Sequence, residues 1–188
     1  QDDPNRATVQ AVQFHPASDP DRPLLLTAGF DKTLRFFQVA EEKSTKVHGI
    51  HCKYNIFPTN LSLELSVPKL PIYSACFLGT SGNVVVSGRR SFFYVYDAVA
   101  GKLDNIPRII GREEKSLEKC TASPDGRTVA FIGNDGYIIL YDTHNKRWIA
   151  NLKMNGSTRS ICFSPDGEEI SASGSDGDVY TWNVKSRR

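Results

Sequence analysis

A glycine-centred pattern occurs four times along this chain and restricts the folds that it can adopt. In three copies, Gly-x-Asp is followed by an aromatic residue six positions after the aspartate, and in the remaining copy an arginine replaces the aspartate. The copies are Gly29/Asp31/Phe37, Gly88/Arg90/Tyr96, Gly133/Asp135/Tyr141 and Gly174/Asp176/Trp182. The glycines are 59 (29 to 88), 45 (88 to 133) and 41 (133 to 174) residues apart, so the chain is built of repeats.

Each unit has the pattern of short strands separated by tight turns. In the last unit, residues 158–163 favour a strand and Ser164-Pro165-Asp166-Gly167 favours a turn, because proline fixes one turn dihedral and glycine tolerates the other. A second strand is predicted at 169–173, a second turn at 174–177 and a third strand at 178–184. The preceding unit repeats this order, so the repeated element is an antiparallel meander.

Repeats of about 40 to 45 residues with several strands each are typical of an all-β propeller of four-stranded blades. We predict blades at about residues 9–67, 72–110, 116–154 and 157–188, the last without its outermost strand, with an insertion at 40–71. At about 40 residues per blade, a seven-bladed ring needs roughly 280 residues. The 188-residue chain is therefore expected to hold about four of seven blades. A small four-bladed ring closed by residues 1–8 is the alternative.

Composition restricts the function classes that the chain can serve. It has 23 basic and 21 acidic residues, and this net charge of +2 is too small to indicate nucleic-acid binding by bulk charge. The sequence shows no apolar run long enough to span a membrane and no signal peptide. No nucleophile elbow, phosphate-binding loop or HExxH pair occurs, so we expect neither an enzyme nor a cofactor site.

The cysteines and histidines do not form a metal motif. The four cysteines have no CxxC spacing. Cys76 and Cys162 occupy the same place in their units, where we expect buried packing cysteines in a reducing compartment. His48, His51 and Cys52 lie close in sequence but lack the fourth ligand of a structural zinc site, so no metal is expected.

The turns resemble those of WD40 repeats. Ser-Pro-Asp-Gly follows the first strand of two units, Gly-Ser-Asp-Gly lies at 174–177, and Trp182-Asn183 stands where the Trp-Asp pair occurs. The stretches at 26–37, 87–93, 109–119 and 152–157 are more specific, because they lie partly outside the repeat. Together they resemble the WD-repeat subunits of UtpB, a subcomplex of the small-subunit processome.

This resemblance implies a non-enzymatic scaffold of ribosome biogenesis in the nucleus, within the nucleolus. The implied partners are other UtpB propeller subunits, the U3 snoRNP and pre-rRNA within the small-subunit processome (90S pre-ribosome), with a role in pre-18S rRNA processing. It implies no cofactor, no membrane and no small-molecule substrate. The alternative is a general WD40 adaptor such as a ubiquitin-ligase substrate receptor. Such receptors often carry Trp-Asp-x-Arg, where this chain has Trp182-Asn-Val-Lys185.

The unit that departs from the repeat gives the candidate site. Asp31, Asp135 and Asp176 are expected to be structural, because a turn aspartate accepts hydrogen bonds from nearby backbone N–H groups. Arg90 cannot accept such bonds. In a WD-type blade this turn and the loop to the next blade lie on the same face, which places the basic residues of both segments together. These residues are Arg89, Arg90, Arg108, Arg112 and Lys115.

We predict that this basic rim contacts RNA phosphate or an acidic partner surface, since arginine suits bidentate pairing. The alternative is internal pairing with Glu113, Glu114 and Glu118, which lie in the same segment.

Overall fold

The computed structural model describes residues 7–39, 45–46, 63–67, 69–111 and 113–187. All regular secondary structure in these ranges is β-strand. No helix that could cross a membrane is found in them.

The strands form four antiparallel sheets in sequence order. The first sheet contains β1 (Val9–Phe14), β2 (Leu24–Gly29), β3 (Thr33–Gln38), β4 (Thr45–Lys46) and β5 (Leu63–Ser66), with β4 and β5 both paired to β3. The second contains β6 (Ser74–Phe77), β7 (Val84–Ser87), β8 (Phe93–Asp97) and β9 (Lys102–Ile106). The third contains β10 (Cys120–Ala122), β11 (Thr128–Ile132), β12 (Tyr137–Asp142) and β13 (Arg147–Lys153). The fourth contains β14 (Thr158–Phe163), β15 (Glu169–Gly174) and β16 (Val179–Asn183).

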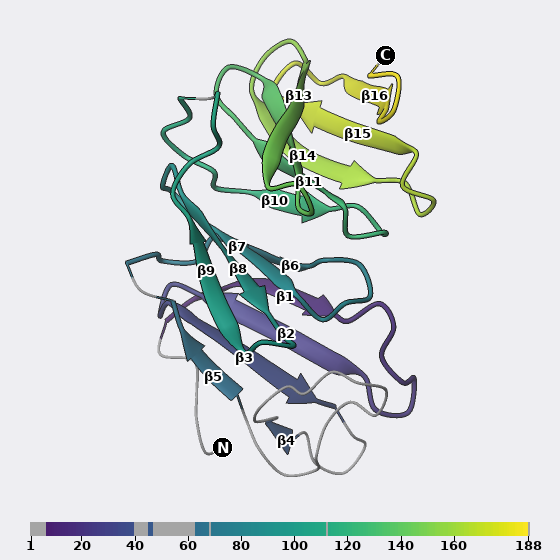
Figure 1. Ribbon diagram of the computed structural model, residues 1–188. Coiled ribbons are helices and arrows are strands. Elements are labelled where there is room, and N and C mark those ends of the chain that lie inside the picture. The colour runs from purple at the N-terminus through teal and green to yellow at the C-terminus, as the bar shows by residue number, and fades with distance from the viewer. Residues whose placement is uncertain (1–6, 40–44, 47–62, 68, 112, 188) are drawn as a thin grey trace.

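The sheets stack face to face in succession (Figure 1). Apolar side chains fill the space between neighbouring sheets. One cluster, which includes Leu26 and Phe36, joins the first two sheets through Val84 and Tyr96. A second joins the next pair, and a third, around Leu140, joins the last pair. The first strands of neighbouring sheets also contact one another, β1 with β6, β6 with β10 and β10 with β14. This is the packing of propeller blades around a shared axis.

The strand β8 is apolar on both faces of its sheet. It begins at Phe93, and Phe93, Tyr94 and Tyr96 are all buried, since the second sheet has a neighbour on each face. Phe93 packs against Phe131 of the third sheet, whereas Tyr96 packs against Phe36 of the first. The consecutive apolar residues of this strand therefore correspond to burial on both faces of the sheet.

Three of the four repeated glycines mark places where one backbone segment passes directly over another, whereas Gly133 faces the side chains of Ile139 and Glu114. A Cβ atom at Gly29, Gly88 or Gly174 would lie 2.4, 2.5 or 2.5 Å from a carbonyl oxygen of the segment that enters the same sheet. These oxygens belong to Thr8, Pro71 and Ser157. Any side chain at these positions would displace the incoming segment, so glycine recurs there.

The cysteines follow the packing prediction in part. Cys76 is buried on β6, with its Sγ 3.8 Å from Sγ of Cys120 on β10, and both are free thiols. The prediction of burial at Cys162 is wrong, because the fourth sheet has no further sheet covering that side among the described residues and the side chain is exposed. Cys52 lies outside the described residues.

This difference predicts the order in which the thiols react. The hydrogen-bonded Cys120 thiol and burial raise the pKa of Cys76 well above its ordinary value, so little thiolate is available. In the folded 188-residue chain, we expect iodoacetamide to label Cys162 and to label Cys76 only after unfolding, measured by peptide mass spectrometry. The Cys162→Ser variant is the control for background labelling. Native labelling of Cys76 as fast as that of Cys162 would contradict the buried packing.

Candidate interaction surface

Turns alternate between the two ends of the sheets because successive strands are antiparallel. The turns β2–β3, β7–β8, β11–β12 and β15–β16 lie at one end with the segments that lead from sheet to sheet, and we call this end the connection face. The opposite end is called the hairpin face. The segment 107–119 runs onto the β7–β8 turn, since the Leu117 N–H donates to the Arg90 carbonyl at 3.0 Å. The structure therefore brings this turn and this segment together.

Arg89 is held by internal contacts on the connection face. Its Nε and one terminal nitrogen donate to the Glu118 carboxylate at 3.0 and 3.3 Å, in a bidentate pair. The guanidinium also lies over the Tyr73 ring, 4.6 Å from its centre, and Tyr73 packs against Phe30 of the first sheet at 4.7 Å. Arg89 thus pairs as the internal alternative expects, and it links three sheets.

The other predicted basic residues are differently placed. Arg90 is exposed, and among the described residues its side chain donates only to the Arg89 carbonyl, at 3.4 Å. Arg108 and Lys115 are exposed and make no hydrogen bond or ion pair to any residue that the structure describes. Arg112 lies outside the described residues. The part of the rim left open to a partner therefore contains Arg90, Arg108 and Lys115, which we call the open rim.

The segment 113–119 also holds the neighbouring sheets in place, a role that the repeat pattern does not reveal. Glu114 is buried and accepts the N–H of Asn134 in the β11–β12 turn at 3.0 Å. Lys119 Nζ donates to the Arg159 carbonyl on β14 at 3.1 Å. With the Arg89–Glu118 pair, this short segment contacts three sheets. Its charged residues therefore act in blade packing as well as at the surface.

Two of the three turn aspartates bond to a residue four positions later. Asp31 accepts from the Thr33 N–H at 3.3 Å and from the Arg35 guanidinium at 2.6 Å, and the Asp31 and Arg35 side chains are only 6% and 1% exposed. Asp176 accepts from the Tyr180 hydroxyl at 2.8 Å. Each aspartate thus ties its turn to the strand that follows.

Asp135 differs from this arrangement. Residue 139, four positions later, is isoleucine and cannot donate, and the Asp135 carboxylate accepts no hydrogen bond from the described part of the chain. Asp135 has a positive φ of 54°, and Lys153 Nζ donates to its carbonyl. Glu114 supplies the carboxylate in this turn instead.

No group of three or more potential metal ligands occurs among the residues that the structure describes. The His48, His51 and Cys52 cluster lies outside those residues.

Stacked antiparallel sheets joined by recurring Gly-x-Asp turns define a WD40-type β-propeller blade array. Residues 149–183 match the family described as "WD domain, G-beta repeat". The chain therefore contains a WD40 repeat in its fourth sheet and the strand that precedes it.

Curated relatives match nearly the whole chain. A U3 small nucleolar RNA-associated protein 18 homolog from Arabidopsis thaliana is 42% identical over 186 residues, covering 99% of this chain and 31% of the relative. The protein of that name from Homo sapiens is 32% identical over 98% of this chain and 30% of its own length. U3 small nucleolar RNA-associated protein 18 of Saccharomyces cerevisiae is 24% identical over 85% of this chain and 27% of its own length. The chain therefore spans about three tenths of these relatives.

Proposed function

We propose that this chain is part of a non-enzymatic scaffold of ribosome biogenesis, a UtpB-type component of the small-subunit processome required for pre-18S rRNA processing in the nucleolus. Its partners in this proposal are the U3 snoRNP, pre-rRNA and other UtpB propeller subunits. The observation that supports it is the similarity along nearly the whole chain to plant, animal and fungal proteins named for association with U3 small nucleolar RNA. WD40 blades suit this role because their turns present many independent contact surfaces.

Affinity purification from growing cells tests the proposal. The tagged full-length protein is expected to recover U3 RNA and pre-rRNA in fast-sedimenting particles, and its depletion is expected to lower 18S but not 25S/28S rRNA. Recovery of cullin-ligase adaptors without U3 RNA would instead support the general adaptor. A second WD40 protein of similar size, purified in parallel, controls for non-specific RNA recovery.

The open rim is the proposed contact of this chain with RNA phosphate. Arg90, Arg108 and Lys115 are exposed and form no ion pair with described residues, so their charges are available to a polyanion. Arg89 is a weaker candidate, since its guanidinium already pairs with Glu118.

Charge removal at the open rim is expected to weaken RNA binding. For a labelled transcript of the 5′ part of the pre-rRNA, Arg90→Ala should lower the salt slope of log K by about 0.7 if one single-strand phosphate contact is lost. Substituting all three residues by alanine should lower the slope by about 2. Lys102→Ala removes a positive charge at the start of β9 on the hairpin face, so it serves as the control variant and should change the slope little. Unchanged affinity and slope in the triple variant, with a stable fold, would reject the contact.

A further inference from the structure

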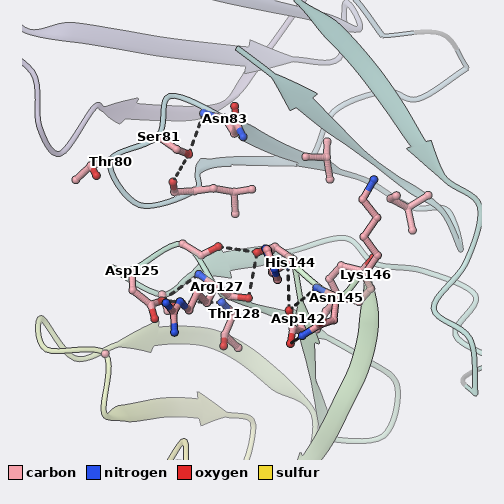
Figure 2. Close-up of a pocket in the computed structure, with 18 of the residues that line it drawn as sticks. Thr80, Ser81, Asn83, Asp125, Arg127, Thr128, Asp142, His144, Asn145 and Lys146 are labelled. Carbon is pink, nitrogen blue, oxygen red and sulfur yellow. Dashed lines mark hydrogen bonds between the residues drawn. The ribbon is translucent and has the colours of Figure 1, made fainter. Parts of the chain in front are cut away.

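A cavity of about 830 Å³ lies on the hairpin face, between the second and third sheets. Figure 2 shows Thr80, Ser81 and Asn83 of the second sheet on one side, with Asp125 and the β12–β13 turn of the third sheet on the other. Its lining includes the apolar side chains of Leu78, Val95 and Ile106. The cavity lies at the opposite end of the sheets from the open rim, and nothing in the proposed function uses it.

Tyr141 supplies a polar group that lacks a partner in this cavity. Its residue lines the cavity and is 3% exposed, and its ring packs edge-on against Phe93 at 5.2 Å. The hydroxyl is buried and makes no hydrogen bond to the residues that the structure describes. Burial raises the pKa of Tyr141, so the hydroxyl stays neutral and can both donate and accept. A buried polar atom without a partner is uncommon in folded proteins and indicates that something else supplies the bond.

The charge of the lining favours a cation. Four acidic residues, Asp97, Asp104, Asp125 and Asp142, line the cavity against three basic ones, Arg127, Lys146 and Lys185. The acidic residues exceed the basic ones by one (four minus three), although the chain as a whole has a net charge of +2.

Ion pairs leave most of the negative charge uncompensated. Asp104 pairs with Lys102 at 2.9 Å and lies 3.8 Å from Nζ of Lys146, which extends towards the second sheet (Figure 2). Lys185 pairs with Glu168 at 3.0 Å.

The remaining three acidic residues, Asp97, Asp125 and Asp142, accept hydrogen bonds only from neutral groups such as backbone N–H. The N–H of Asn145 lowers the pKa of Asp142, so that carboxylate stays ionised at neutral pH.

We propose that this cavity binds an arginine side chain carried by a basic segment of a protein partner. The apolar wall would contact the arginine stem, the Tyr141 hydroxyl would accept from the guanidinium, and the surrounding carboxylates would supply the opposite charge. Arginine fits better than lysine because its planar group presents five donors to several acceptors at once. Nucleic acid does not fit, since three lining carboxylates without an ion pair would repel phosphate.

Fluorescence anisotropy with the full-length protein tests this. The probe is fluorescein-labelled Gly-Arg-Gly-Arg-Gly-Arg-Gly, and its matched control carries citrulline, a neutral isostere, at each arginine. The arginine probe is expected to bind at least about tenfold more tightly than the citrulline probe.

Tyr141→Phe should weaken binding about fivefold without harming the fold, because the hydroxyl has no partner to lose. Asp97→Asn with Asp125→Asn should weaken it about tenfold, since asparagine keeps an acceptor oxygen for the turns and removes only the charge.

Glu118→Gln on the connection face is the control variant and should bind as the wild type does. Equal binding of both peptides, no binding, or equal weakening by Glu118→Gln would overturn the proposal. Tight binding of a labelled ten-nucleotide oligouridine that Arg127→Ala abolishes would also overturn it, because the cavity would then be an anion site.

Discussion

The substitution Asp31→Ala is expected to lower the free energy of unfolding by about 3–5 kcal/mol, because it removes the buried carboxylate that lies against the Arg35 guanidinium. Arg35 is 1% exposed and Asp31 lies 2.6 Å from it, so water cannot easily replace the lost partner. Urea denaturation of the full-length protein, followed by far-ultraviolet circular dichroism, measures the change.

Two further variants separate this charge effect from loss of the turn. Asp176→Ala removes the equivalent turn aspartate in an exposed position and should cost much less. The double variant Asp31→Ala with Arg35→Met removes both charges and should recover much of the lost stability, since an apolar replacement of a buried pair is often nearly neutral. A single Asp31→Ala variant as stable as the wild type would show that the pair does not stabilise the first sheet.

Gly126→Ala is expected to lower the free energy of unfolding by about 2–4 kcal/mol, the sum of left-handed backbone strain and overpacking. Gly126 has a φ of +72°, and a Cβ there would lie 2.8 Å from the Leu78 carbonyl carbon and 2.9 Å from its oxygen. Backbone therefore meets backbone between the second and third sheets. Neither side can yield without separating the two sheets.

The chain offers a matched control at Gly101. This glycine also has a positive φ, +64°, but no atom lies within 4 Å of its added Cβ. Gly101→Ala should therefore cost only the backbone term, about 1–2 kcal/mol. The difference between the two urea midpoints measures the contact between the sheets, and equal midpoints would mean that the contact contributes nothing.

The strands could be predicted from sequence because each turn signal is local. Ser164-Pro165-Asp166-Gly167 ends β14, and the apolar residues on either side fix strand lengths to within one or two residues. The edge strand β5 was also predictable from its alternating leucines, and it pairs with β3. Periodicity reports burial, but it does not identify the sheet that buries each face.

Contacts that join distant positions could not be predicted in this way. The repeat predicts an accepting carboxylate at Asp135, yet Glu114 takes that role from 20 residues away. Similarly, the basic rim was predicted as one group, but Arg89 is bonded internally while Arg90 is not paired with any described carboxylate. The number of charges does not tell which arginine is paired internally and which is left open. That depends on where residues 113–119 cross the β7–β8 turn.

The cavity was missed for the same reason. Tyr141 is the aromatic residue of the third repeat copy, and its ring is buried. Only the arrangement of the second and third sheets shows that its hydroxyl has no hydrogen-bond partner. The one signal in the sequence was the choice of tyrosine, where a purely apolar contact would be satisfied by phenylalanine.

Each described apolar cluster is shared by two consecutive sheets, and this sets the order in which the sheets can fold during translation. The buried residues of the first cluster end at Ala98, so that interface can close before the third sheet has been translated. The third and fourth sheets can each then pack against the apolar face of the sheet that was translated before them. The sheets can therefore pack in the order in which they are translated, so that little apolar surface of the nascent chain is exposed to solvent at any time.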